Sequence, residues 1–314
     1  MKKVKRMFLI VLLFATWSSV FAISKATLIH STPLFLTAVR MLLAAFLLLG
    51  YLFFKKRSSF KLNKIQLVSV LILGVLNIYL VNFLEFWGLQ YLPAAKVCFI
   101  YSLSPFFAAL FSYFHFNEKM NPKKWLGMGV GFLGMLPVFY SKSNASLSTF
   151  FTFSLPEIAI AGAALFSVYS WVLLRMLVKE NSLSPLMANG SSMLIGGLLA
   201  LAHSLFADRW LPLPVASGSF LPFLGGAFLI ILISNLLCYN LYGYLLKKYT
   251  ATFMSFVGLL SPFFASLSEW LILGTKPSLT ILSSTCIVIL GLWIHYQEEL
   301  KQGYILKKSS EIKT

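Results

Sequence analysis

The sequence predicts an all-α integral membrane protein with ten transmembrane helices, arranged as two inverted five-helix repeats. Three observations lead to this fold class. The 314-residue chain is 59% hydrophobic and only 11% charged, which leaves too few polar residues to cover a soluble protein of this size. Apolar runs of about 20 residues, the length of a membrane-spanning helix, recur along the whole chain. The hexapeptide LSPFFA occurs at 103–108 and again at 260–265, and this offset of 157 residues is half the chain.

Ten apolar runs are long enough to be spans, and short connections that contain prolines separate them. The predicted ranges are 7–25, 33–54, 66–90, 93–116, 123–140, 155–177, 185–207, 219–246, 250–273 and 278–297. No connection is long enough to fold as a separate soluble domain. We therefore predict a first repeat over 1–142, a second repeat over 155–300 and a basic cytoplasmic tail over 301–314.

The distribution of lysine and arginine indicates that both termini are cytoplasmic. With a cytoplasmic N-terminus, twenty basic residues fall on the cytoplasmic side: Lys2, Lys3, Lys5, Arg6, Lys55, Lys56, Arg57, Lys61, Lys64, Lys119, Lys123, Lys124, Arg175, Lys179, Lys247, Lys248, Lys301, Lys307, Lys308 and Lys313. Only four, Lys25, Lys142, Arg209 and Lys276, fall on the opposite side, while Arg40 and Lys96 lie within spans. This asymmetry supports the span count and explains the net charge of +17 without a nucleic-acid partner.

The first span has a competing interpretation as a secretory signal, because a basic start and an apolar stretch precede a Val-Phe-Ala sequence that a signal peptidase could cut. Removal of this span would leave nine spans and unequal halves, so the repeat argues against cleavage.

No motif in the chain points to an enzyme or to a bound cofactor. HExxH, P-loop and GxSxG sequences and clustered histidines are all missing from the sequence. Cys98, Cys238 and Cys286 lie inside apolar runs, without the spacing of a metal site or a disulfide framework, and are expected to be buried thiols.

The repeated hexapeptide lies in span 4 and in span 9, which are the equivalent helices of the two halves. These two spans cross the membrane in opposite directions, so the halves have inverted topology, as is typical of alternating-access transporters. Pro105 and Pro262 each fall near the middle of their span and remove a hydrogen bond to the carbonyl four residues earlier, at Tyr101 and Gly258. We predict that the two prolines line the transport path or act as hinges.

Around these residues the chain resembles the drug/metabolite transporter superfamily, in its EamA-type branch with ten helices. The resemblance rests on Trp17-Ser18-Ser19, on Pro33 followed by Arg40, and on the stretch from Leu103 to Gly127, where Pro105, Glu118 and Gly127 match the family pattern. The second copy departs from the pattern, because Thr275 stands where the family usually has glutamate. The resemblance implies a substrate cavity between the first four helices of each half, peripheral fifth and tenth spans, and secondary transport without ATPase activity or a cofactor.

Ionisable groups inside a membrane are expensive and usually functional. Glu85 and Glu269 are the deepest acids, and Arg40 and Lys96 are the basic candidates. The acids near span ends, Glu118, Glu157, Glu298 and Glu299, are expected to be solvated or paired with lysine.

The 157-residue offset relates polar positions of spans 3 and 8. It matches Asn82 to Tyr239, Glu85 to Tyr242 and Ile78 to Asn235, and each set shares one helical face. Trp17, Tyr79, Tyr101, Tyr169 and Trp171 are further aromatic candidates. We predict a substrate site that contains Glu85, Asn82, Trp17, Tyr79, Tyr101, Asn235, Tyr239, Tyr242 and Glu269.

An acid among several aromatic rings suits an organic cation, or a flat ring that bears a cationic centre. Some members of the resembled superfamily, in obligate intracellular bacteria, import S-adenosylmethionine in exchange for S-adenosylhomocysteine. This exchange across the bacterial inner membrane is the most specific function that the resemblance implies. Export of amino acids or drugs is the main transport alternative, and a non-transporting membrane receptor or scaffold is the alternative from another class.

Overall fold

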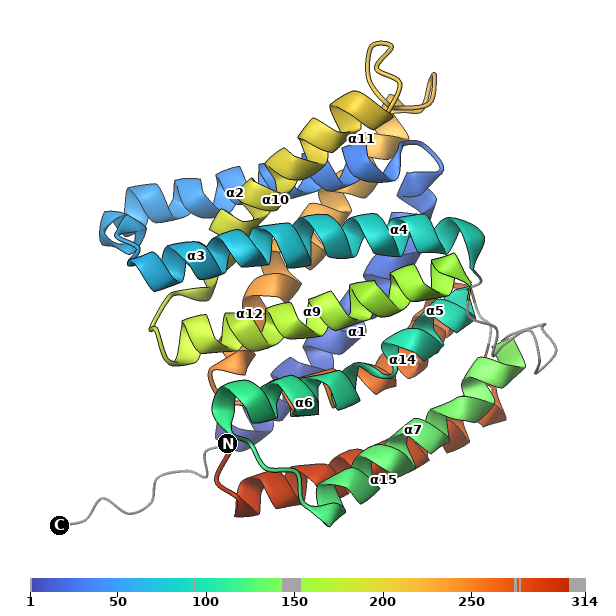
Figure 1. Cartoon of the computed structure of the whole chain (residues 1–314). Helices are drawn as coiled ribbons and strands as arrows, with labels where there is room; N and C mark the ends of the chain where they lie inside the picture. Colours follow the sequence, from blue (N-terminus) through green and yellow to red (C-terminus); the bar gives the residue numbers. More distant parts are fainter. Residues whose placement is uncertain (1, 93, 143–153, 274–275, 277, 305–314) are drawn as a thin grey trace.

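The computed structural model describes residues 2–92, 94–142, 154–273, 276 and 278–304, and they form a bundle of helices (Figure 1). The helices before residue 150 are α1 (Lys2–Leu28), α2 (Pro33–Lys55), α3 (Lys64–Leu73), α4 (Val81–Tyr91), α5 (Ala94–Tyr101), α6 (Ser104–Phe116) and α7 (Pro122–Lys142). Those after it are α9 (Leu155–Lys179), α10 (Pro185–Ala207), α11 (Phe220–Ile230), α12 (Tyr239–Leu246), α13 (Ala251–Val257), α14 (Ser261–Leu273) and α15 (Leu279–Lys301). A 3₁₀ turn, Arg57–Phe60, connects α2 to α3.

The helical ranges agree with the predicted apolar runs to within a few residues, except for longer ends at Lys2–Leu28 and Leu279–Lys301. In the described part of the chain, seven helical stretches are long and apolar enough to cross a membrane. Several helices begin at an asparagine, serine or threonine that caps the helix N-terminus. Asn63 and Gln66 form a capping box at α3, and Ser184, Thr250 and Ser278 accept backbone hydrogen bonds at α10, α13 and α15.

Two of the long spans contain a π-helical stretch at matched positions. Gly74–Leu80 joins α3 to α4, and Ile231–Cys238 joins α11 to α12. The two stretches begin 157 residues apart, which is the offset of the repeated hexapeptide. A π turn leaves backbone carbonyls without their usual helical donors, and in lipid these carbonyls need other partners.

Two further spans are broken at matched positions, immediately before the repeated prolines. The helix stops after Tyr101 and resumes at Ser104, and a 3₁₀ turn over Gly258–Leu260 separates α13 from α14. Tyr101 and Gly258 carry the carbonyls that lose a helical hydrogen bond to the prolines, so each break lies where a proline interrupts the hydrogen-bond pattern of the helix. Pro105 is buried and Pro262 is half-buried.

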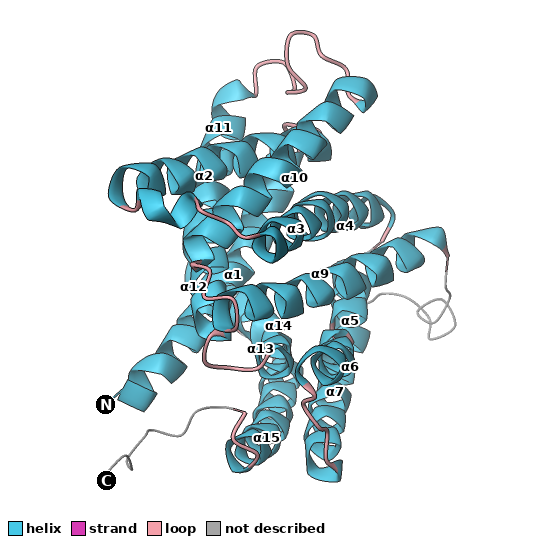
Figure 2. Ribbon diagram, turned by 60° about the vertical axis from the view of Figure 1, so that its left-hand side comes forward, coloured by secondary structure: helices cyan, strands magenta, loops and turns pink. Residues whose placement is uncertain are grey.

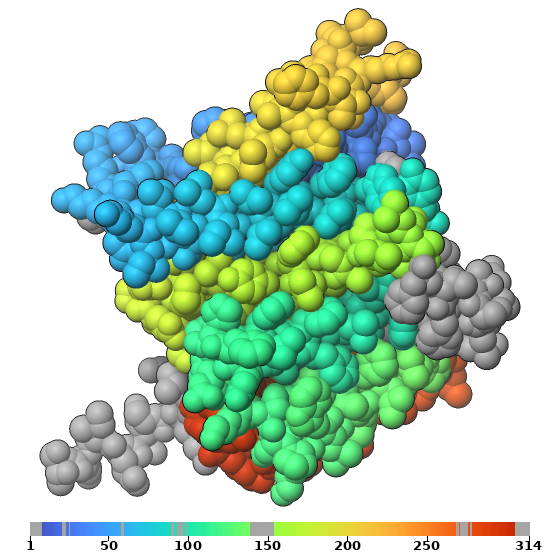
Figure 3. Space-filling model, viewed as in Figure 1, coloured from blue at the N-terminus to red at the C-terminus, as the bar shows by residue number. Residues whose placement is uncertain are grey.

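Helices at equivalent positions of the two halves pair with each other. The longest contacts run between α2 and α10 and between α7 and α15 (Figures 1 and 2). Other contacts recur in matched form, since α3 packs on α9 as α11 packs on α1, and α6 packs on α9 as α14 packs on α1. Figure 3 shows α3–α4, α9 and α6 side by side as bands of closely packed side chains.

Glycines allow α7 and α15 to approach closely. A Cβ atom added at Gly127 would lie 2.7 Å from the carbonyl oxygen of Gly291, and one added at Gly291 would lie 2.4 Å from the carbonyl oxygen of Gly127. Both obstacles are backbone atoms, which cannot rotate away. Small residues at such crossings are typical of helix pairs in membranes.

We expect Gly127→Val to destabilise the folded protein by about 1–3 kcal/mol, the usual range for overpacking, because the added side chain collides with the α15 backbone. Gly129→Val is the matched control on the same helix, since nothing lies within 4 Å of an added Cβ there. Thermal unfolding in detergent measures both variants. Equal stability of the two variants would contradict the observed helix crossing.

Candidate functional site

Glu85 lies in α4 and is hydrogen bonded to an aromatic residue of α5. The hydroxyl of Tyr101 donates to Oε2 of Glu85 at 2.7 Å. Tyr101 is the last residue of α5, so the helix break before Pro105 positions this hydroxyl next to the acid. The structure therefore brings together two of the predicted site residues, and it gives Glu85 a partner that the sequence did not identify.

A basic side chain approaches the same helix from α2. Nη2 of Arg40 donates to Oδ1 of Asn82, while Nδ2 of Asn82 donates at 2.7 Å to the carbonyl of Ile78. That carbonyl belongs to the π-helical stretch, so the side chain of Asn82 gives a backbone acceptor of this irregular segment a donor from the protein. Arg40 is 5% exposed and lies close enough to Glu85 and Tyr239 to interact electrostatically with both.

The second half contains a similar arrangement made only of neutral groups. Nδ2 of Asn240 donates at 2.9 Å to the carbonyl of Leu236 in the second π-helical stretch. Oδ1 of Asn240 accepts a hydrogen bond of 3.1 Å from Nδ2 of Asn189 in α10. Asn189 thus donates a hydrogen bond to Asn240 in the second half, as Arg40 does to Asn82 in the first half.

Four aromatic side chains from three helices form a cluster beside Arg40. We call this set the aromatic box; it consists of Trp17 of α1, Trp171 of α9, and Tyr239 and Tyr242 of α12. Ring centroids are 5.9 Å apart for Trp17 and Trp171, 5.6 Å for Trp17 and Tyr239, and 4.3 Å for Trp171 and Tyr242. The rings contact one another directly and are mostly edge-on or tilted, a favourable arrangement for aromatic groups.

Tyr239 relates the aromatic box to the charged groups, because its ring contacts those of Trp17 and Trp171 and its hydroxyl is within range of an electrostatic interaction with Arg40 and Glu85. This combination offers a carboxyl group, a guanidinium and clustered aromatic rings within one buried region. It can bind an organic ion that carries a flat ring.

Other predicted site residues lie elsewhere. The hydroxyl of Tyr79 is 3.0 Å from Nδ1 of His203 in α10, and no contact in the described residues links Tyr79 to Glu85 or the aromatic box. Asn235 is fully buried; its Nδ2 is 3.0 Å from the sulfur of Met41, and its Oδ1 has no partner among the described residues. The side chains of Glu269 and Lys96 lie outside the described residues.

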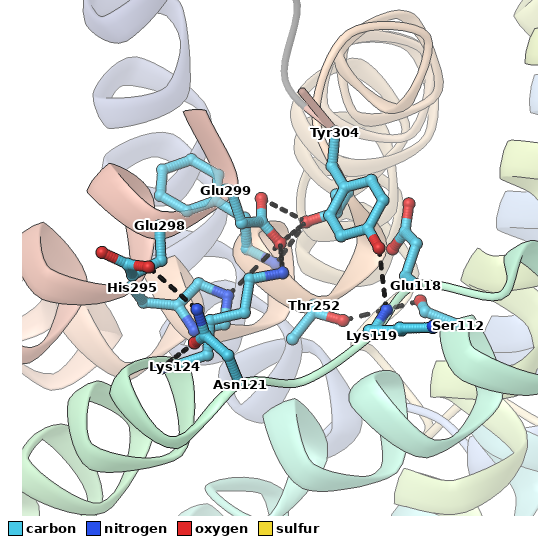
Figure 4. Close-up of polar contacts among 12 residues, drawn as sticks. Ser112, Glu118, Lys119, Asn121, Lys124, Thr252, His295, Glu298, Glu299 and Tyr304 are labelled. Carbon is cyan, nitrogen blue, oxygen red and sulfur yellow. Dashed lines mark hydrogen bonds and ion pairs between the residues drawn. The ribbon is translucent and has the colours of Figure 1, made fainter. Parts of the chain in front are cut away.

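A second polar cluster connects the two halves at the end of the bundle where α6 and α15 terminate (Figure 4). Lys124 of α7 is 3.5 Å from Oε1 of Glu299 in α15, and Thr250 donates to the same carboxylate at 2.7 Å. Nε2 of His295 is 3.3 Å from Glu299 as well. We call this set the α7–α15 ion cluster.

Another buried ion pair lies close to it. Nη2 of Arg175 in α9 is 2.5 Å from Oε1 of Glu118, which follows α6. Glu118 and Glu299 are 5% and 0% exposed. The expectation that these acids are solvated is therefore wrong, because partners from the other half of the chain bury them. The expectation of a lysine partner holds for Glu299 but not for Glu118, whose partner is Arg175.

Glu298 and Glu157 follow simpler patterns at helix ends. Lys301, on the same helix, donates to Glu298 at 2.7 Å, in agreement with the expected lysine neighbour, and Asn121 donates to its other oxygen. Glu157 accepts a backbone hydrogen bond from Ser154 at 2.9 Å in a capping box at the start of α9.

Comparison with known proteins identifies the family. The model of the EamA-like transporter family matches residues 4–140 and again residues 154–297. The chain belongs to the EamA-like transporter family. It is therefore a multi-pass membrane transporter protein and not an enzyme. A solved crystal structure shares the fold with a TM-score of 0.74 at 15% sequence identity, covering 95% of this chain and 98% of the other.

Curated relatives share more of the sequence. A protein of Chlamydia muridarum named S-adenosylmethionine/S-adenosylhomocysteine transporter is 40% identical over 302 residues, which are 95% of this chain and 94% of the relative. A protein of Chlamydia trachomatis serovar L2 with the same name is 38% identical over 301 residues, which are 95% of this chain and 91% of the relative.

Several residues of the site were not among those predicted from sequence. Trp171 was a candidate aromatic that was left out of the predicted site, although it faces Trp17 from the equivalent helix of the other half. Asn240 was missed because the 157-residue offset matches Tyr239, not Asn240, to Asn82. Lys124 and Arg175 were counted only as charges on the cytoplasmic side, although the structure buries both.

Proposed function

We propose that this chain exchanges S-adenosylmethionine for S-adenosylhomocysteine across the bacterial inner membrane. The observation that carries the proposal is the 40% and 38% identity, over 95% of the chain, to relatives that bear this name. The buried site suits such a substrate, because S-adenosylmethionine combines a cationic sulfonium and an ammonium group with a flat adenine ring.

The chemistry of the site supports a division of roles. Glu85 is suited to a cationic group, since an acid in a membrane interior favours a cation or a proton as its partner. The aromatic box is suited to stack on adenine, which both exchanged molecules share. Because its rings now contact one another, substrate binding requires α1 to separate from α9 and α12.

We propose that ten spans form two inverted five-helix repeats, over 1–142 and 155–300. Four features support this: the double match to the family model, the paired π-helical stretches, the paired breaks before Pro105 and Pro262, and the matched contacts between helices. Trp17 and Trp171 belong to the first helix of each half, so their contact is consistent with a substrate site on the axis that relates the halves.

Alternating access follows from this architecture. We propose Pro105 and Pro262 as hinges, because each begins a helical segment after a break and can let the two parts of a span tilt separately. The α7–α15 ion cluster and the pair of Glu118 with Arg175 join the halves at one end, which is consistent with a conformation closed at that end.

We expect both termini, and with them this closed end, to face the cytoplasm, because twenty of the twenty-four basic residues outside span interiors then lie on the cytoplasmic side. A single cysteine at Lys61, in a cysteine-free background, tests the orientation with a membrane-impermeant maleimide. Labelling in inside-out vesicles but not in intact cells is the expected result. The reverse pattern would overturn the orientation.

We expect Glu85→Gln to fold and to reach the membrane but to lower S-adenosylmethionine uptake by at least about tenfold, which is about 1.4 kcal/mol. Glutamine retains an oxygen that can accept from Tyr101 but has no charge for a cation. Uptake into proteoliposomes loaded with S-adenosylhomocysteine measures the effect, with exposed Glu180→Gln as the control.

A similar loss is expected for S-adenosylhomocysteine, which carries the same ammonium group, measured as exchange of labelled against unlabelled S-adenosylhomocysteine. Near wild-type uptake by Glu85→Gln would reject the assigned role of this acid. If the wild-type protein exchanges amino acids or drugs but neither adenosyl compound, the proposed substrate is wrong.

A further inference from the structure

Arg40 differs from the other buried cations that the structure describes. Arg175 lies 2.5 Å from a carboxylate oxygen of Glu118, and Lys124 lies 3.5 Å from one of Glu299. Among the residues that the structure describes, no carboxylate lies within ion-pair distance of Arg40. Its Nη2 donates to the neutral amide of Asn82, and its Nε, fully buried, has no hydrogen-bond partner among the described residues.

The charge of Arg40 is not needed for the hydrogen bond that it makes. In the second half, Asn189 donates to Asn240 at 3.1 Å, and Asn240 donates to a carbonyl of the π-helical stretch, as Asn82 does in the first half. A neutral amide is therefore sufficient to hold this arrangement together. Burying a charge without a carboxylate partner costs free energy, which indicates that the arginine has a functional role.

The surroundings of Arg40 include both recognition elements of the proposed site. Its guanidinium carbon lies 5.8 Å from the centre of the Phe86 ring, and Glu85 and Tyr239 are its electrostatic neighbours. Glu85 is held by Tyr101 instead of by Arg40. Glu85 follows Asn82, to which Arg40 donates, by three residues on the same face of α4. The guanidinium and the carboxyl group therefore share one region without being bonded to each other, as a receptor for a molecule with both charges requires.

We propose that Arg40 binds the carboxylate of the transported molecule, and that Arg40 and Glu85 together recognise a zwitterionic α-amino-acid head group. This inference rests on the proposed function and specifies its substrate class. A guanidinium presents a planar set of donors that matches a carboxylate, and the free Nε belongs to this set. The carboxyl group of Glu85 accepts hydrogen bonds from the ammonium group. The aromatic box then stacks on the ring at the other end of the substrate.

The same geometry explains how one site can serve both directions of exchange. S-adenosylmethionine and S-adenosylhomocysteine have the same amino-acid head group and the same adenine ring, and they differ at sulfur. Recognition at both ends leaves the sulfur between them. A molecule with the ring but without the carboxylate should bind weakly, and this difference is measurable.

The test compares binding of S-adenosylmethionine and of its decarboxylated analogue to the purified full-length protein by isothermal titration calorimetry. We expect the wild-type protein to bind S-adenosylmethionine at least about tenfold more tightly. Arg40→Gln keeps an amide donor for Asn82 and should bind both ligands with nearly equal, weaker affinity. Arg40→Lys keeps the charge without the planar fork, and we expect it to discriminate less well than wild type.

Asn189→Ala is the matched control, because it removes the corresponding hydrogen bond in the second half without a change in charge. It should leave the ratio of the two affinities at the wild-type value. If the wild-type protein binds both ligands equally well, or if Arg40→Gln keeps the wild-type ratio, Arg40 does not bind the carboxylate. If Arg40→Gln does not fold, the ratio of the two ligand affinities in the wild-type protein and in Arg40→Lys still decides whether Arg40 binds the carboxylate.

Exchange in proteoliposomes, measured separately, distinguishes this inference from the proposed function. Discrimination in binding without exchange would overturn the proposed exchange and leave the role of Arg40 intact. Exchange without discrimination would overturn the role of Arg40 and leave the exchange intact. If neither ligand binds, both are overturned.

Discussion

Polar groups in the interior of this bundle need partners from the protein itself, because hydrocarbon provides none. Each irregular part of the structure can be understood from this requirement. The π-helical stretches expose carbonyls, and Asn82 and Asn240 donate to them. Buried Glu118 and Glu299 are joined to Arg175 and Lys124, which lie on helices of the other half. These ion pairs between the two halves fix the halves relative to each other more specifically than apolar packing does.

The two ends of the bundle are joined by different chemistry. One end has the α7–α15 ion cluster and the pair of Glu118 with Arg175. At the offset of 157 residues, Glu118 corresponds to Thr275, Lys124 to Ile281 and His295 to Val138, so these ionic partners have no counterparts in the sequence. At the other end, Thr32 donates to Asp208 at 2.8 Å, and a single antiparallel bridge pairs Ser31 with Val215. The two ends of the bundle therefore differ in their chemistry, although helices at equivalent positions of the two halves pair with each other.

The helices were predictable because they depend on local information. Apolar length, prolines and capping residues such as Asn63 determine where a helix begins and ends, and Pro105 and Pro262 fix the breaks. The partners of the site were less predictable, because a contact between α2 and α4, or between α7 and α15, depends on tertiary packing. Asn240 illustrates a subtler reason: the second π-helical stretch has eight residues and the first has seven, so beyond these stretches a fixed offset of 157 pairs residues that are one position out of register. The sequence therefore predicted the site as a set of residue types; the structure joins Glu85 to Tyr101 and places Tyr79 beside His203.

The central claim is that the two halves open alternately at the two ends of the bundle around one buried site. Distances between paired spin labels test it most directly, with one pair at Lys119 and Glu180 beside the Glu118–Arg175 ion pair, and another at Ile29 and Ser217 beside the Ser31–Val215 bridge. The account predicts a short and a long distance for each pair, with substrate shifting the two pairs in opposite directions. A single unchanged distance for both pairs, in protein that exchanges substrate, would contradict it.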